Sequence, residues 1–250
     1  MIKAGLALLL GCITIATSAQ DLKIGLTGGI NTTWLLNKNV ADAGDHLNVM
    51  TTFGFSAGLN TIYSFSEHAG ISLSIIFSNH NQKYQGEIQD ISGNTAVEYE
   101  SFLNLTYFDV PLLFRFQSPK GPYLEIGPQF GFLINAQEDF TISKEIEFVE
   151  NYQSRRFKNN FQKTNVAAIM GVGFDYDASE KIAIATGLRF GYGFTDVTRE
   201  FTKMELEILS ATNTLSYTSA ISHQGENLIY SYEPSTRFFG GFLIGVAYKL

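Results

Sequence analysis

The sequence of 250 residues contains one cysteine, five prolines and few charges, since only 16% of its residues are charged. After residue 20, no apolar run is long enough for a membrane-spanning helix, which needs about 20 apolar residues. One cysteine allows no internal disulfide, so a large core or a closed sheet must hold an exported chain of this kind together. The chain also lacks Lys and Arg clusters, and its 24 acidic residues against 17 basic ones argue against nucleic acid as a partner.

The first 19 residues have the layout of a secretory signal peptide. Lys3 precedes an apolar run from Ala4 to about Ala16, and the small residues Thr17 and Ala19 provide a cleavage site before Gln20. As an alternative, "LLGC" at residues 9–12 resembles a lipobox and would make Cys12 a lipidated N-terminus. We expect a signal peptide at residues 1–19 and one domain at residues 20–250.

Aromatic residues make up 14% of the chain and glycines number 23, and both fall into a repeated pattern of alternation. Apolar and polar residues alternate with the two-residue period of β-strands that have one apolar and one polar face. The pattern predicts eight strands, at residues 22–36, 53–65, 69–79, 102–117, 122–135, 164–177, 181–195 and 237–250.

The links between these strands alternate between short and long. Tight turns occur at residues 66–69, 118–121 and 177–181, whereas the intervening links are long and polar. Outer-membrane barrels have short periplasmic turns and long extracellular loops. The sequence therefore predicts an eight-stranded antiparallel transmembrane β-barrel, an up-and-down meander whose aromatic face meets lipid and whose termini are both periplasmic. A soluble periplasmic sandwich or a lipocalin-like barrel is the alternative.

The polar face of each strand then lines a narrow lumen. Eight strands enclose a space that side chains can nearly fill, which argues against a general porin. We expect a structural polar network in this lumen, made of Asp109, Arg115, Glu125, Gln129, Asp175 and Arg189. "SPKG" at residues 118–121 suits a three-residue hairpin loop with glycine in the left-handed position, which places Arg115 opposite Glu125 and predicts an ion pair.

"YFDVPLLFRF", followed by a short turn and "GPYLEIGPQFGFLINA", resembles the central signature of the PorT-type outer-membrane β-barrel domain of Bacteroidetes. The "SAQ" signal end and "GLRFGYGFTDV" are similar to that group as well. The resemblance spans essentially the mature chain. It implies a barrel without catalytic residues, in a group whose best-known member is implicated in protein secretion across the outer membrane.

Signals for other chemistry are weak. The four histidines, His46, His68, His80 and His223, fall in predicted loops or turns without metal-ligand spacing, so we expect solvated side chains and neither metal nor cofactor. Ser78, His80 and Asp90 are a poor match to the Ser, His and Asp that a lipid acyltransferase carries near the outer rim of a barrel. The acidic run at residues 144–150 lacks calcium-loop spacing, and we expect a solvated loop or a short hairpin there.

Two further patterns concern the strand ends. Alternation within residues 202–233 suggests an extension of the last two strands. Tyrosines near strand ends suit the aromatic girdles of a membrane interface; they are Tyr63, Tyr107, Tyr123, Tyr176, Tyr192 and Tyr248.

Three functions fit these observations. The first is a structural or interaction barrel, such as an accessory of a secretion or envelope complex, with outer-membrane lipid and envelope proteins as partners. The second is a narrow conduit for small solutes, and the third is a lipid-modifying enzyme at the rim. The filled lumen favours the first over the second, and the missing catalytic constellation argues against the third.

The barrel assignment predicts that the purified chain is heat-modifiable. A closed sheet that resists detergent keeps its compact shape until it is boiled, so boiled and unboiled samples should migrate differently on a denaturing gel. Identical migration, together with recovery in the soluble periplasmic fraction, would contradict the membrane assignment.

Overall fold

The computed structural model describes residues 21–89, 95–144, 151–223 and 231–250. The elements follow in chain order as β1 (Asp21–Leu36), α2 (Lys38–Asp42), η1 (Gly44–His46), β2 (Leu47–Met50), β3 (Gly54–Ser64), β4 (Ala69–Gln89), β5 (Thr95–Gln117), β6 (Pro122–Ile142), β7 (Tyr152–Arg156), η2 (Lys158–Asn160), β8 (Thr164–Asp177), β9 (Ile182–Gly193), α3 (Lys203–Ala211), α4 (Tyr217–Ser222) and β10 (Thr236–Lys249). The predicted signal peptide with Cys12, Asp90, and residues 145–150 of the acidic run lie outside the described residues.

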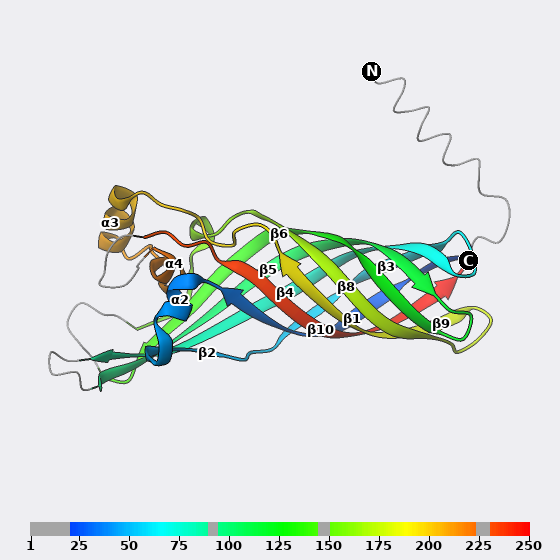
Figure 1. Ribbon diagram of the computed structural model, residues 1–250, viewed down its shortest axis with the longest axis horizontal. Helices are drawn as coiled ribbons and strands as arrows, with labels where there is room; N and C mark the ends of the chain where they lie inside the picture. The colour runs from blue at the N-terminus through cyan, green and yellow to red at the C-terminus, as the bar shows by residue number, and fades with distance from the viewer. Residues whose placement is uncertain (1–20, 90–94, 145–150, 224–230) are drawn as a thin grey trace, which may run out of the picture.

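Eight antiparallel strands form a closed ring, which confirms the predicted fold class (Figure 1). The ring runs β1, β3, β4, β5, β6, β8, β9 and β10, and β10 pairs with β1 from Lys23 opposite Lys249 to Leu36 opposite Thr236. Closure removes the two free edges that an open sheet would present to lipid. Among the described residues, no helix is long and apolar enough to cross a membrane.

The apolar face of the sheet points outward. Exposed large apolar side chains lie on all eight strands of the ring, and on β4, β5 and β6 they cover residues 71–77, 108–116 and 124–132. The opposite faces of these segments hold buried polar residues such as Ser74, Arg115 and Glu125. An apolar band this large around a monomer is covered by lipid rather than water, so the predicted orientation of the faces is confirmed.

The short turns lie together at one end of the barrel, which we call the turn end, near the C-terminus (Figure 1). The opposite end, the loop end, holds α2, α3 and α4. At the turn end, Ser118 N donates to Pro122 O at 2.8 Å, and Gly121 has a φ of +107°. Only glycine adopts that φ without strain, and the resulting hairpin register sets Arg115 opposite Glu125, as the turn chemistry predicts.

The eight predicted strands all form, but three are longer than predicted. β4, β5 and β6 continue beyond the lipid-facing band at the loop end, and β2 and β7 pair with β4 and β6 there. Neither face of these extensions meets lipid, so their sequence lacks the apolar alternation of a membrane strand and resembles that of a loop.

A β-bulge marks the point where β6 leaves the lipid-facing band. Leu133 lies opposite Tyr107 and Asn135 opposite Thr106, so Ile134 has no partner on β5. The extra residue exchanges the two faces of the strand. In β6 before the bulge, odd-numbered residues such as Glu125 point inward. After the bulge, even-numbered residues such as Glu138 point inward.

Two sequence-based expectations about the loop end are wrong. Residues 202–223 hold α3 and α4 instead of strand extensions, because Thr202 and Glu205 form a reciprocal capping box and Ser216 caps α4. Tyr107 and Tyr123 do not join an outward girdle, because both lie on inward positions of β5 and β6. Tyr176, Tyr192 and Tyr248 are exposed at strand ends, as expected.

Arginine at the middle of the lipid-facing band should destabilise the barrel. Val172 and Leu188 lie opposite each other on β8 and β9 and are 47% and 46% exposed. Val172→Arg or Leu188→Arg should each lower the free energy of unfolding by about 2–4 kcal/mol, measured by urea unfolding in lipid vesicles.

Leu188→Met is the matched control, since it keeps an apolar side chain at the same site. Gly187→Arg should fail for a different reason, because a Cβ there would lie 2.4 Å from Tyr123 Oη inside the lumen. Tolerance of arginine at both lipid-facing positions would show that the faces are assigned wrongly.

Candidate functional site

The lumen near the turn end holds five charged side chains, Lys23, Arg115, Glu125, Asp175 and Arg189, which we call the five-charge cluster. They come from five strands, β1, β5, β6, β8 and β9. Their order in space alternates in sign, from Lys23 through Asp175, Arg115 and Glu125 to Arg189. Each charge therefore has an oppositely charged neighbour, which offsets the large cost of burial.

Arg115 lies at the centre of the five-charge cluster. Its Nη2 donates to Asp175 Oδ1 at 2.7 Å, and its Nη1 lies 3.5 Å from Glu125 Oε2. Its guanidinium carbon lies 3.4 Å from the centroid of the Tyr123 ring, a cation–π contact. Arg115 thus shares its charge between two carboxylates and an aromatic face.

Glu125 makes its closest contact with Arg189, two strands away, whose Nε donates to Oε1. The strand between them, β8, contributes Gly171, which lies opposite both residues in the sheet. A Cβ at Gly171 would lie 2.9 Å from Glu125 Oε1 and 3.1 Å from Arg189 Cγ. The glycine therefore leaves the space in which the two side chains meet.

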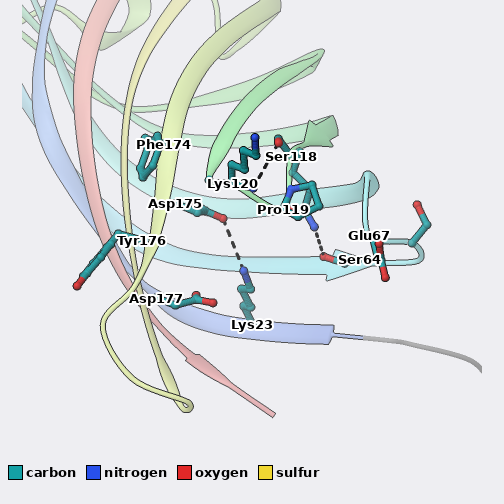
Figure 2. Close-up of a pocket in the computed structure, with 13 residues that line it drawn as sticks. Lys23, Ser64, Glu67, Ser118, Pro119, Lys120, Phe174, Asp175, Tyr176 and Asp177 are labelled. Carbon is teal, nitrogen blue, oxygen red and sulfur yellow. Dashed lines mark hydrogen bonds and ion pairs between the residues drawn. The ribbon is translucent and has the colours of Figure 1, made fainter.

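A pocket of about 600 Å³ opens at the turn end below the five-charge cluster (Figure 2). Lys23 and Asp175 form its inner wall, 3.6 Å apart, and the turns at residues 66–67 and 118–121 form its rim. Toward the mouth, Lys249 pairs with Asp177 at 2.7 Å. Charges of both signs line this pocket.

A second cluster, the Asp109 cluster, lies about 20 Å further along β5 and consists of Ser78, His80, Asp109 and Arg237. Ser78 Oγ and His80 Nε2 both bind Asp109 Oδ2, and Arg237 Nη2 lies 3.6 Å from Oδ1. Arg237 is fully buried between the rings of Tyr107 and Phe239.

The six residues predicted from the sequence all lie on the lumen side, but in two groups. Arg115, Glu125, Asp175 and Arg189 come together, whereas Asp109 and Gln129 lie further along the lumen. Asp109 and Gln129 line a cavity of about 50 Å³ between the clusters, and Arg189 reaches the same cavity from the first group. Gln129 Nε2 is buried and has no hydrogen-bond partner in the described part of the chain.

Lys23, His80 and Arg237 lie in the lumen but were not among the six residues predicted for its polar network. Lys23 on β1 and Arg237 on β10 are odd-numbered, and the odd-numbered residues of both strands point inward. The alternation in the sequence could therefore have placed both side chains in the lumen. His80 and His223 were expected in solvated loops, and this is wrong, because both are buried, on β4 and at the end of α4. His46 and His68 are exposed.

The Asp109 cluster differs from a Ser–His–Asp triad. In a triad, serine and aspartate bind different ring nitrogens of the histidine. Here Ser78 and Asp109 both contact Nε2, and Thr33 Oγ1 occupies Nδ1 at 2.9 Å. Among the described residues, no group of three or more His, Cys, Asp or Glu is placed to hold a metal ion.

A cap closes the loop end of the lumen. An apolar cluster joins inward residues of the wall to residues of the loops, and comprises Leu35, Leu103, Leu105, Tyr107, Leu133, Ala136, Phe157, Phe161 and Val197. Above it, α4 is held by buried polar side chains. Asn160 Oδ1 accepts from Ser216 N at 2.7 Å, and Asn37 Nδ2 donates to Ser222 Oγ at 3.4 Å.

Glu138 is the central anchor of this cap. Its buried carboxylate accepts from Ser101 Oγ, Tyr152 Oη, the backbone N of Tyr217 and Thr218, and Thr218 Oγ1, at 2.7–3.2 Å. Glu138 lies beyond the lipid-facing band, where burial raises the pKa of its carboxyl and the hydrogen bonds from Thr218 and Ser101 oppose that rise. The first turn of α4 is thereby tied to β6.

A family model described as the outer membrane protein beta-barrel domain matches residues 18–199. A search of curated proteins found no match. Solved structures with a similar fold include OprG from Pseudomonas aeruginosa, with 13% identity, a TM-score of 0.39 and coverage of 92% of this chain and 95% of that one. AlkL in lipid bilayers has 15% identity, a TM-score of 0.45 and coverage of 94% of both chains. Ail of Yersinia pestis has 10% identity, a TM-score of 0.35 and coverage of 92% of this chain and 99% of that one. Similarities at this level carry no information on function.

The contacts of Glu125 predict unequal coupling to its two arginines. In double-mutant cycles, Glu125→Gln should couple to Arg189→Met and to Arg115→Met by about 0.5–3 kcal/mol. The coupling to Arg189 should be larger, because that contact is a direct hydrogen bond. The measurement is the free energy of unfolding in urea with the barrel in vesicles.

Removing one partner should destabilise the barrel more than removing both, since a lone buried charge is the costlier state. The Lys249–Asp177 pair is the matched control, because Asp177 is exposed and such pairs couple by under about 1 kcal/mol. Additive effects at Glu125 with both arginines would rule out these ion pairs.

Proposed function

The chain belongs to the family of outer-membrane β-barrel domains, and we propose that it is a closed barrel with a structural or interaction role and no catalytic activity. We further propose that it is of the PorT type and acts as an accessory of a secretion or envelope complex. The support for this finer assignment is the resemblance of residues 107–136 to that group. In this proposal the turn end and both termini face the periplasm, as short turns do in such barrels.

The main support for a barrel without an open channel is that side chains obstruct the lumen at three levels. The five-charge cluster crosses it near the turn end, the Asp109 cluster crosses it further along, and the cap fills the loop end. Each level contains side chains that are almost fully buried. A solute would have to break buried ion pairs and then displace α4.

The absence of catalysis is supported by the geometry of the Asp109 cluster. Ser78 and His80 are 2% and 3% exposed, beneath the cap and away from the rim where a lipid substrate would enter. Ser78 Oγ and Asp109 Oδ2 both contact Nε2 of His80. His80 therefore cannot accept a proton from Ser78 on one ring nitrogen while Asp109 orients the ring through the other, as an activated serine requires.

An interaction role is supported by the rigid platform at the loop end. The extensions of β4, β5 and β6 rise beyond the lipid-facing band, and hydrogen bonds with the buried side chains of Glu138, Asn160 and Asn37 hold α4 at this end. A surface fixed in this way loses little conformational entropy when a partner binds.

A narrow conduit is the second candidate. The observation in its favour is the pocket of about 600 Å³ at the turn end, which leads directly to the five-charge cluster. In that case a single rearrangement of Arg115 and Asp175 would have to admit a small solute.

Conductance in planar bilayers separates the two candidates. The purified barrel should show no single-channel steps. The variant Arg115→Ala/Glu125→Ala/Arg189→Ala should also stay closed, because the Asp109 cluster and the cap are intact. Adding Asp109→Ala and Arg237→Ala, together with Phe157→Ala, Phe161→Ala and Glu138→Ala in the cap, should give steps, since all three levels are then weakened.

Steps from the unmodified barrel would favour the conduit and overturn the closed barrel. Crosslinking in native membranes followed by purification tests the interaction role. Recovery of no envelope protein at the loop end or the turn end, under conditions that crosslink a known complex, would contradict it.

A further inference from the structure

One side of the loop end carries a group of basic residues, three of which form no ion pair with a carboxylate among the described residues. Residues 151–163, "NYQSRRFKNNFQK", contain four basic residues and no acidic one, in a chain with a net charge of −7. Arg156 on β7, Lys158 at the start of η2, and Lys163 just before β8 are all exposed. Within the described part of the chain, no carboxylate forms an ion pair with these three.

Arg199 joins this group from another loop. Its backbone N donates to Asn160 O at 2.9 Å, and Phe161 forms a β-bridge with Thr198. Its guanidinium is half-exposed and lies 3.6 Å from Glu205. We call Arg156, Lys158, Lys163 and Arg199 the basic rim patch.

The basic rim patch begins directly above the lipid-facing band. Phe132, 49% exposed, pairs with Thr164, and Lys163 O accepts from Leu133 N at 2.8 Å. Phe194, 67% exposed, lies on the same side, since its N donates to Val166 O. Aromatic residues in such positions mark the level of the lipid headgroups.

The other members follow within the height of a headgroup layer. Phe157 N donates to Ala136 O at 2.9 Å, which places the neighbouring Lys158 roughly 10 Å beyond Leu133. Lysine and arginine side chains at this height extend their charges along the membrane surface.

Two basic residues elsewhere at the loop end are paired with carboxylates. Lys83 lies 2.9 Å from Glu100, and Lys38 lies 3.9 Å from Glu233. The acidic chain as a whole repels anions, so the local excess of positive charge on this side fits a specific anionic partner at the same height.

We propose that the basic rim patch binds the phosphate groups of lipid headgroups in the leaflet around the loop end. Lysine offers a point charge to phosphate, and arginine offers a planar pair of donors. The site requires the barrel to lie in lipid with its loop end at a membrane surface, and it does not depend on a closed lumen or on the absence of catalysis. With the proposed orientation, this leaflet is the outer one.

The test is selective retention of a phosphorylated lipid. The full barrel, folded in an uncharged detergent, is mixed with bis-phosphorylated lipid A or with its dephosphorylated form, and bound lipid is counted by native mass spectrometry. The unmodified barrel should prefer the phosphorylated form. Arg156→Gln/Lys158→Gln/Lys163→Gln should lower that preference at least about tenfold, because each basic residue near an anionic surface strengthens binding severalfold.

The matched control is Lys38→Gln/Lys83→Gln/Lys120→Gln, which removes the same charge at other sites and should keep the preference. Migration of unboiled samples on a gel shows that each variant is folded. An equal loss in both variants, or an unchanged preference in the first, would overturn the proposal. Displacement of the lipid by millimolar inorganic phosphate would also overturn it, since the ligand would then be free phosphate.

Discussion

The constraint on which this structure depends is the hydrogen bonding of the backbone in lipid. Every N–H and C=O that crosses the hydrocarbon needs a partner within the protein, so the sheet must close on itself. β1 and β10, at opposite ends of the chain, supply that closure along their whole length. Once the ring is closed, successive side chains of each strand point alternately into lipid and into the lumen.

The lumen is narrow, so its composition follows from the same constraint. Charged side chains there cannot remain hydrated individually, and they are arranged so that each meets the opposite sign. At two places a glycine on a neighbouring strand leaves room for these long side chains. Gly171 between Glu125 and Arg189 and Gly131 beside Asp109 both provide that space. These two glycines are therefore part of the packing of the charges.

The ring itself could be predicted from the sequence because the two-residue period and the turn residues are local signals. The register of Arg115 and Glu125 followed from the loop at residues 118–121 alone. The pairing of Glu125 with Arg189 could not be predicted in the same way, since it depends on which strands are neighbours and on a glycine in the third strand. The cap was also beyond reach, because Glu138 faces inward only after the bulge at Ile134, and the capping residues of α3 and α4 were overlooked in an apparent alternation.

The unequal lengths of the strands make the barrel directional in the plane of the membrane. β4, β5 and β6 continue well past the lipid-facing band, whereas β8 begins and β9 ends close to it. A neighbour that diffuses in the same membrane therefore meets extended strands on one side, and on another side short strands that continue into helices and loops. The barrel presents different surfaces to neighbours that approach it from different directions.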